Sequence, residues 1–481
     1  MQGRQQSVSR DAPKRKMKVL AGITSYGTKN DVHLERVIRE YNSMSFNVDI
    51  VVFSNVPKSL GERIEVIVGL PTRDPWSLGF AHKRVFADRR DGYDLFIYSE
   101  DDVLITERNI HAFLRAQEVL PANEIVGFFR YEEGPSGAVN FPEVHGHFHW
   151  DPGSVRTRGG YTFAYFTNEH SACYIATRDQ MRRAVDSGGF SVGPREGKYD
   201  LLCTAATDIY TQCGMRKLIC VSHVDDFLVH HLPNRYVGTS YGVDEPALRI
   251  QLDVLLQIAR GTQRPSSLLP DSLGQGHYPK DFYEPADGQI VSLVPAQAQR
   301  VLSLGCGWGA MEALLAEKGL HVVAVPLDPV IGACAGARGV ETTPADFGQA
   351  LAYLAGKEFD VVVVSNLLHL IDDPPGLLLR FAPLLSPEGR IIAKTPTGSE
   401  VLRLLKNLRS AKRIAAADPR ELAGSDAISE KGLRSCFEAA GLRGREFVRI
   451  LPPWAKALHR GTLGLLDSWL ASEIVAVGTR A

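Results

Sequence analysis

The feature that most narrows what this chain can fold into is a short apolar run that ends in three adjacent carboxylates. Residues 94–103 read DLFIYSEDDV, which predicts a buried strand followed by Glu100, Asp101 and Asp102. Neighbouring side chains point to opposite faces of a regular strand, so these carboxylates can converge only where the strand turns into a loop. Converging anions repel each other, and a fold tolerates them mainly around a cation. The pattern predicts a site for Mg²⁺ or Mn²⁺, with a solvated acidic turn as the alternative.

Two other apolar runs lie before this strand. Residues 18–27 read KVLAGITSYG and residues 48–55 read VDIVVFSN, with helical patterns between the runs. This alternation predicts a mostly parallel sheet, and such sheets bind ligands at the carboxyl ends of their strands. We therefore expect Thr24, Tyr26 and Asn55 to lie along that edge. Three basic residues are predicted to contact phosphate, with a solvated basic face as the alternative: Arg73, His82 and Lys83.

A later segment, residues 207–233, contributes a Thr207-Asp208 pair, a turn at Cys213-Gly214 and the histidines His230 and His231. In this order, after the acidic strand, these elements resemble the nucleotide-sugar glycosyltransferases of the GT-A fold over residues 17–250. The resemblance implies a divalent metal on Asp101 and Asp102, completed by His231 or His230. It also implies that Asp208 opens a helix and acts as general base toward a glycan acceptor. The alternative for Asp208 is a helix N-cap.

Residues 144–152 read VHGHFHWDP and place His145, His147 and His149 at a spacing of two. On a strand these imidazoles would share one face and could bind a metal. The flanking Gly and Pro favour a loop instead, which we expect to act as a lid on the acceptor side.

A second domain follows a segment rich in Pro, Gly and Ser, residues 258–278, which is predicted to be a linker. Residues 299–319 then read as a strand, a glycine turn and a helix, with Gly305, Gly307 and Gly309 in the turn. With the strands HVVAVPLD and FDVVVVSN after it, this succession resembles the class I S-adenosylmethionine-dependent methyltransferases over residues 279–481. The resemblance implies that the cofactor lies over the three glycines, with Asp346 at its adenine.

Two positions depart from that family's pattern. Ser303 stands where the family usually has an acidic residue, and Pro326 stands where it usually has an acid that accepts the ribose hydroxyls. Proline has neither an acceptor side chain nor an N–H group. We expect Asp328, two residues later, to reach the ribose instead. His369 matches part of a Glu-His element that is frequent in the family.

Composition limits the partners and the cellular compartment that the sequence predicts. The net charge of −1 offers no electrostatic case for nucleic acid as a partner, and seven unpatterned cysteines indicate free thiols in the cytoplasm. Residues 1–16 are polar and basic and predict a disordered tail. No run reaches the roughly 20 apolar residues of a membrane span. Residues 452–472 could make a peripheral membrane contact, with a packing helix as the alternative.

The sequence thus predicts an α/β protein with two doubly wound domains, a GT-A-like mixed sheet in residues 17–257 and a Rossmann-like methyltransferase sheet in residues 279–481. The predicted function is bifunctional: metal-dependent transfer from a nucleotide-sugar donor, and S-adenosylmethionine-dependent O-methylation of a glycan. Two alternatives stay open. One is a methyltransferase with a non-catalytic glycan- or nucleotide-binding N-terminal domain, and the other is a glycosyltransferase with an inactive methyltransferase-like scaffold.

Overall fold

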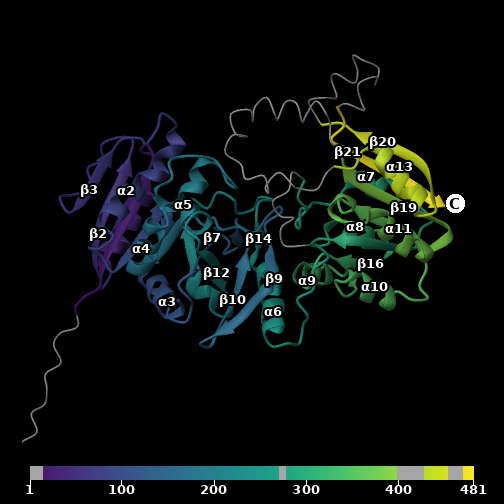
Figure 1. Ribbon diagram of the computed structural model, residues 1–481, viewed down its shortest axis with the longest axis horizontal. Coiled ribbons are helices and arrows are strands. Elements are labelled where there is room, and N and C mark those ends of the chain that lie inside the picture. Colours follow the sequence, from purple (N-terminus) through teal and green to yellow (C-terminus); the bar gives the residue numbers. More distant parts are fainter. Residues whose placement is uncertain (1–14, 270–277, 398–426, 453–469) are drawn as a thin grey trace, which may run out of the picture. The chain divides into compact units, whose positions relative to one another are not determined.

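The computed structural model describes residues 15–269, 278–397, 427–452 and 470–481. The chain divides into two compact units, and each is described by itself (Figure 1). Unit 1 comprises Met1–Glu143 and Glu169–Thr239, and unit 2 comprises Val144–Asn168 and Ser240–Ala481. This division does not coincide with the predicted linker at 258–278. Residues 1–14 of the predicted tail and residues 453–469 of the predicted membrane-contacting segment lie outside the described residues.

The main sheet of unit 1 has the strand order β11-β4-β1-β2-β3. Its strands are β1 (Lys18–Ser25), β2 (Asn47–Ser54), β3 (Ile64–Val68), β4 (Leu95–Glu100) and β11 (Cys173–Thr177). The first four run parallel and β11 is antiparallel to β4, so the predicted mostly parallel sheet is confirmed. Because Ser25 pairs with Ser54 and Thr24 with Glu100, the strands end together at one carboxyl edge.

Helices pack on this sheet. In α1 (Asp31–Ser43) the buried residues Leu34, Val37, Ile38 and Tyr41 recur at the helical period, so one face of the helix is buried. Helices α2 (Ala81–Asp88) and α4 (Arg178–Asp186) contact each other; α2 packs on β1, and α4 packs on β4 and β11.

The rest of unit 1 supplies residues to the edge of that sheet. It contains α3 (Glu107–Gln117), α5 (Leu201–Thr211) and the short strands β5 (Val103–Leu104), β6 (Glu124–Val126), β7 (Phe129–Glu133), β8 (Val139–Phe141), β12 (Arg216–Cys220) and β13 (Leu228–His231). Strand β13 pairs antiparallel with β5, which places His231 opposite Val103. This pairing brings His231 next to Asp102, although 129 positions separate them in the sequence.

Unit 2 contains a seven-stranded sheet in the order β17-β16-β15-β18-β19-β21-β20. Its strands are β15 (Arg300–Cys306), β16 (His321–Pro326), β17 (Glu341–Thr342), β18 (Phe359–Ser365), β19 (Leu385–Pro396), β20 (Leu442–Ile450) and β21 (Glu473–Arg480). Valines and isoleucines from its central strands form one buried core. The chain runs outward from β15 to β17 and then returns to β18 on the other side of β15. Ligands of open α/β sheets bind at the point where the order reverses in this way.

Helices connect these strands: α7 (Gly288–Leu293), α8 (Ala310–Glu317), α9 (Pro329–Ala337), α10 (Phe347–Tyr353), α11 (Pro374–Phe381) and α13 (Glu430–Ala439). Helix α8 contacts α9, and α11 contacts α13. The predicted α/β architecture with a doubly wound C-terminal sheet is confirmed. Unit 2 also includes elements from before the predicted linker: β9 (Trp150–Arg158), β10 (Tyr161–Phe166) and α6 (Glu245–Ala259), which packs on α9.

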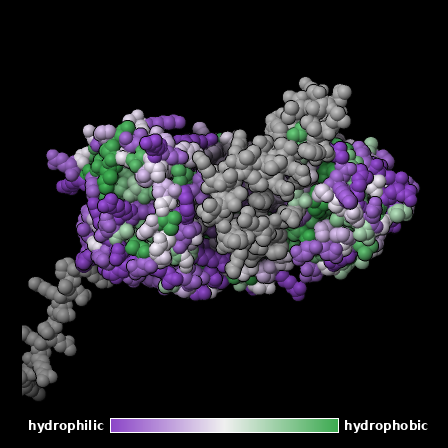
Figure 2. Space-filling view, turned by 45° about the horizontal axis from the view of Figure 1, so that its top comes forward, coloured by the Kyte–Doolittle hydropathy of each residue, from purple (hydrophilic) through white to green (hydrophobic). Residues whose placement is uncertain are grey.

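The described surface is largely polar. Hydrophilic residues make up most of the described surface visible in Figure 2, and hydrophobic residues form smaller areas. Within the described ranges, no helix is both long enough and apolar enough to cross a bilayer. All seven cysteines are free thiols.

Candidate functional site

The glycine turn in unit 2 begins at the end of β15 and leads into α8. Gly305 and Gly309 have φ angles of 74° and 85°, which L side chains rarely adopt, and Gly309 is the residue before α8 begins. A Cβ atom on Gly307 would lie 2.4 Å from the carbonyl oxygen of Phe282. The turn therefore needs glycine for its backbone conformation and for this close approach, as the sequence predicted.

The segment that leads into this domain is tied to the carboxyl edge of the sheet beside the turn. The Trp308 amide donates to the Phe282 carbonyl oxygen at 2.9 Å. Lys280 is buried, and its Nζ donates to the carbonyl oxygen of Ser365, at the end of β18, at 2.9 Å. The Nε2 atom of His369 lies 2.8 Å from the carbonyl oxygen of Tyr278. Residues 278–284 thus adjoin both the glycine turn and the end of β18.

His369 has the chemistry of a base. Its Nε2 must carry the proton, because a carbonyl oxygen can only accept, and this leaves Nδ1 as the acceptor nitrogen. Nδ1 is buried and has no hydrogen-bond partner. Burial lowers the pKa of His369, so the imidazole is neutral near pH 7.

Ser303 is the first departure from the methyltransferase pattern. A carboxylate from the next helix, that of Glu312, lies against it. The Ser303 hydroxyl donates to Glu312 Oε1 at 2.6 Å, and both side chains are buried. Glu312 lies in α8, so an acidic group does stand beside this strand position. Sequence reasoning missed it, because Glu312 reads as an ordinary residue in the first turn of a helix.

The second departure is Pro326, for which Asp328 was predicted to substitute. Asp328 is buried and is the N-cap of α9: its Oδ1 accepts from the amides of Val330 and Ile331 at 2.8 and 2.9 Å. Its Oδ2 lies 3.0 Å from Nε2 of His149. Oδ1 thus caps the helix and Oδ2 faces His149, an arrangement that disfavours the predicted contact from Asp328 to a ribose; that contact stays a prediction.

His149 fits neither of the two predictions made for the histidine-rich segment. Its ring stacks on Phe282 at 4.3 Å between centroids, and Nδ1 lies 2.9 Å from the Tyr283 hydroxyl. The side chain is only 2% exposed. It is a buried part of unit 2, neither a residue of a mobile lid nor one of a row of metal ligands.

Asp346 lies just after the short strand β17 and is the N-cap of α10, where Oδ1 accepts from the Gln349 amide at 2.8 Å. The side chain is half-buried. An adenine contact by Asp346 stays a prediction.

Comparison with known families identifies this part of the chain. A family model described as a methyltransferase domain matches residues 278–446. Residues 278–446 are a methyltransferase domain. The doubly wound sheet and the glycine turn place it in the class I, S-adenosylmethionine-dependent kind, and the resemblance stated from the sequence is confirmed for this part of the chain.

Named relatives agree with this assignment. A ubiquinone biosynthesis O-methyltransferase of Xylella fastidiosa is 34% identical over 111 residues, which are 22% of this chain and 45% of that protein. A trans-aconitate 2-methyltransferase of Mycobacterium tuberculosis is 32% identical over 128 residues, 26% of this chain and 46% of that protein. The chain thus spans less than half the length of these curated relatives.

Among solved structures, a methyltransferase from Mesorhizobium loti is 17% identical with a TM-score of 0.31, and the match covers 40% of this chain and 96% of that one. The N-methyltransferase NodS from Bradyrhizobium japonicum, in complex with S-adenosyl-L-homocysteine, is 16% identical with a TM-score of 0.27, covering 38% and 78%. The family match begins at residue 278, so it does not bear on the glycosyltransferase resemblance of unit 1.

The acidic strand end of unit 1 lies at the carboxyl edge of its sheet, outside the methyltransferase domain. Asp101 and Asp102 are each 5% exposed. The Asn30 amide nitrogen lies between them and donates to Asp101 Oδ1 at 2.9 Å and to Asp102 Oδ2 at 3.0 Å. Burial raises the pKa of Glu100 to about 8 and that of Asp101 to about 6. The Asn30 amide therefore bridges the two carboxylates, a role that the sequence analysis gave to a cation.

His231 faces Asp102. Its Nδ1 lies 2.5 Å from Glu132 Oε1, which orients the ring, and its Nε2 lies 3.6 Å from Asp102 Oδ2. Burial alone would raise the pKa of Asp102, but the neighbouring His231 and the charges of Arg130 and Arg235 lower it. In the described part of the chain, no three His, Cys, Asp or Glu residues are grouped as metal ligands. The predicted ligand set of Asp101, Asp102 and His231 is therefore not assembled in this structure.

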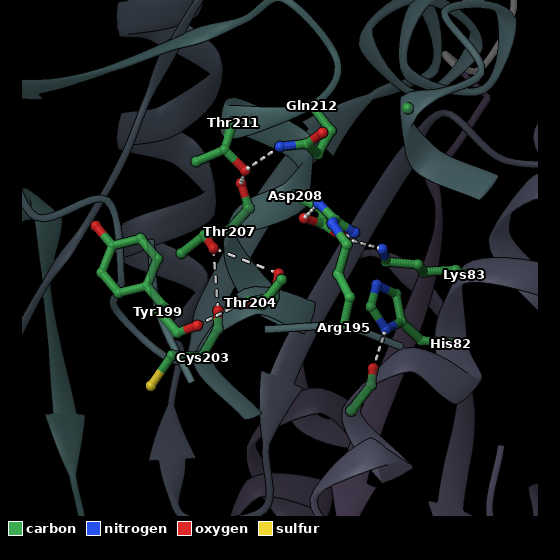
Figure 3. Close-up of polar contacts among 12 residues, drawn as sticks. His82, Lys83, Arg195, Tyr199, Cys203, Thr204, Thr207, Asp208, Thr211 and Gln212 are labelled. Atoms are coloured by element: carbon green, nitrogen blue, oxygen red, sulfur yellow. Dashed lines mark hydrogen bonds and ion pairs between the residues drawn. The ribbon is translucent and has the colours of Figure 1, made fainter. Parts of the chain in front are cut away.

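Asp208 does not open a helix, contrary to the prediction. Helix α5 begins at Leu201 with Asp200 as its N-cap, and Asp208 lies near its other end, fully buried. Lys83 Nζ donates to Asp208 Oδ2, and Arg195 donates to Oδ1 at 2.8 Å and to Oδ2 at 3.2 Å (Figure 3). Two cations enclose the carboxylate, which is an arrangement for an ion-pair cluster rather than for a base that must face an acceptor hydroxyl.

The other predicted residues of unit 1 have mixed outcomes. Thr24 is buried, with its hydroxyl 3.5 Å from that of Tyr98, and Asn55 Oδ1 accepts from the Gly27 amide at 2.7 Å. Tyr26 is 51% exposed at the same edge. Arg73 is exposed. Phosphate or nucleotide contacts by these residues stay predictions.

His82 was predicted to contact phosphate or to lie on a solvated face, and neither holds. It is fully buried, with its ring nitrogens 2.6 Å from the Gly79 carbonyl oxygen and 2.7 Å from the Tyr174 hydroxyl.

Proposed function

We propose that this protein is an S-adenosylmethionine-dependent methyltransferase whose chemistry resides in the C-terminal domain. The observation that carries the proposal is the glycine turn at the carboxyl end of β15, where Gly305 and Gly309 adopt positive φ angles. It lies within the part of the chain that matches a methyltransferase family. The turn presents backbone rather than side chains at the edge where such sheets bind ligands.

The residues present fit the adenosyl cofactor in most respects. The three glycines would lie under it, Glu312 supplies an acid beside Ser303, and Asp346, the N-cap of α10, would contact the adenine. When bound, the cofactor supplies an activated methyl group on its sulfonium. The chain itself must orient the acceptor and remove its proton, and His369 Nδ1, neutral and unpartnered, is suited to accept that proton. The name O-methyltransferase among the relatives supports an oxygen acceptor.

Calorimetric titration of the full chain with S-adenosylmethionine and S-adenosylhomocysteine tests the proposal. Both should bind, and Gly307→Ala should abolish binding, because its Cβ would collide with the Phe282 carbonyl oxygen. Gly336→Ala is the matched control, since a Cβ there meets nothing within 4 Å. Absence of binding to the unmodified chain at millimolar ligand would overturn the proposal and favour a scaffold role.

Unit 1 supports a second candidate function, the binding of a nucleotide or nucleotide sugar through a divalent cation. The observation that favours it is that Glu100 Oε1 and Asp102 Oδ1 are buried without a hydrogen-bond partner. Buried carboxylate oxygens normally have partners, and Mn²⁺ or Mg²⁺ takes oxygen ligands. Because Asp208 is enclosed by cations, the observation supports a binding role for unit 1 more than glycosyl transfer.

Titration of UDP and GDP with and without Mn²⁺ tests this second function. Mn²⁺ should strengthen nucleotide binding, and Asp102→Ala should remove that gain. Asp91→Ala, at an exposed ion pair of the same unit, is the control. A nucleotide affinity that changes neither with Mn²⁺ nor with Asp102→Ala would argue against a cation at this strand end.

A further inference from the structure

Unit 2 contains a cleft of about 770 Å³ that is lined only in part by residues of the methyltransferase match. One wall is α6 and the segment after it, which precede residue 278. The other wall is the end of β16, the first turns of α9 and the residues around β17 and α10. The side chains that matter for the argument are Arg249, Asp253, Gln257, Arg264, Pro326 and Gln349.

The cleft begins one strand away from the glycine turn. Pro326 is the last residue of β16, and after a shift in register it pairs with Cys306, which lies within the turn. The Thr343 amide donates to the Ala324 carbonyl oxygen, so the end of β17 lies alongside. Pro326 therefore both adjoins the glycine turn and lines the cleft.

The adenosyl cofactor carries two adjacent ribose hydroxyls, which are hydrogen-bond donors. A carboxylate is the acceptor that holds such a pair most strongly. The strand end of β16 does not provide it: Pro326 has no acceptor side chain, and both oxygens of Asp328 are engaged by the start of α9 and by His149.

Asp253 is the one acidic residue among the described residues that line the cleft. It lies in α6 and is exposed. The Gln257 amide donates to its Oδ2 at 2.7 Å. Arg249 bonds to Glu245, one turn earlier in the helix, so the nearest guanidinium on α6 has a different partner. The end of β16, which lacks an acidic side chain, and helix α6, which carries Asp253, therefore line the same cleft.

We propose that Asp253 is the residue that accepts the ribose hydroxyls of the adenosyl cofactor. The acid missing at Pro326 is thereby supplied by α6, from outside the methyltransferase domain. This inference rests on the proposed function and adds to it that residues 245–266 form part of the cofactor site.

The test compares S-adenosylhomocysteine with its 2′-deoxy analogue by calorimetry, using the full chain. Asp253→Asn keeps the shape of the side chain and removes its charge. The substitution should weaken the binding of S-adenosylhomocysteine by about 10- to 100-fold, which is the usual loss for a hydrogen bond to a charged group. The loss should be smaller for the 2′-deoxy analogue, which has one hydroxyl fewer to offer. Glu317→Gln, at an exposed acid of α8, makes the same charge change away from the cleft and should have no effect.

The outcomes separate the two proposals. If the unmodified chain binds S-adenosylhomocysteine and Asp253→Asn binds it equally well, the role of Asp253 is refuted while the proposed function stands. An equal loss for both ligands would mean that Asp253 acts through general charge and does not contact the diol, which also refutes the inference. A chain that binds neither ligand overturns both proposals.

Discussion

The glycine turn of the methyltransferase domain and the acidic strand end of unit 1 both follow a buried parallel strand, yet they are held in different ways. The turn depends on backbone: Gly305 and Gly309 have positive φ angles, and Gly307 lies against a carbonyl oxygen. The acidic end depends on side chains from distant parts of the chain, including the Asn30 amide and His231.

This difference explains which prediction succeeded. A backbone requirement is met by a local residue type, so three glycines after an apolar strand indicate the turn directly. A carboxylate is compatible with a cation, an amide, a histidine or a lysine as its partner, and the sequence does not say which of them the fold brings near. The four predictions below test that contrast, beginning with the largest expected effect.

The first prediction concerns the buried carboxylate of Asp208. Asp208→Asn removes the charge that balances Lys83 and Arg195, and Lys83 is itself buried. Leaving one partner of a buried ion pair uncompensated costs about 3–5 kcal/mol, so the free energy of unfolding of unit 1 should fall by that amount. Chemical denaturation of the full chain measures it.

Asp91→Asn provides the control, because the Asp91–Arg182 pair is exposed and its loss should cost at most about 1 kcal/mol. If Asp208→Asn instead kept full stability and abolished an activity of unit 1, Asp208 would be a base after all.

The second prediction concerns pH. Burial lowers the pKa of His82 from 6.5 to about 3. Below pH 6.5 the unfolded chain takes up a proton that the folded unit does not accept until about pH 3. The stabilisation is therefore complete above pH 6.5 and is lost as the pH falls toward 3, by about 1.4 kcal/mol per pH unit within that window. At pH 5 the loss should reach about 2 kcal/mol.

Unfolding curves between pH 7 and pH 4 measure this loss. His82→Gln should flatten the dependence, whereas His111→Gln, at an exposed position, should leave it unchanged. A slope that survives His82→Gln would assign the acid sensitivity to another group.

Sequence reasoning reached the sheets, the glycine turn and the carboxyl edges of the strands, because apolar periodicity and glycine placement are local. Sequence reasoning failed where the role of a polar side chain depends on which distant residue the fold brings next to it. Asp328 and Asp208 were given predicted roles, and each lies against a residue far away in the sequence, His149 in one case and Lys83 in the other. The spaced histidines of residues 144–152 did mark His149 as unusual, but nothing in the pattern pointed to Asp328.

The third prediction concerns the acid beside the glycine turn. Glu312→Ala removes the acceptor of the buried Ser303 hydroxyl and should lower the free energy of unfolding by about 1–3 kcal/mol. Glu312→Gln keeps an acceptor oxygen at the same place and should cost less. If the two variants were equally destabilised, the charge of Glu312 rather than its hydrogen bond would be the stabilising factor at this strand.

The fourth prediction has the smallest expected effect. It tests whether glycine is required only where the backbone conformation or a close contact demands it. Gly332 and Gly336 both lie in α9, one turn apart. A Cβ on Gly336 meets nothing within 4 Å, so Gly336→Ala should stabilise the helix by about 0.5–1 kcal/mol, the usual gain in a helix interior. A Cβ on Gly332 would lie 2.8 Å from the side chain of Pro326, so Gly332→Ala should be destabilising. Thermal unfolding of the two variants compares the signs directly. Equal stabilisation by both would show that α9 and Pro326 can move apart, and the wall of the cleft at Pro326 would then be adjustable rather than fixed.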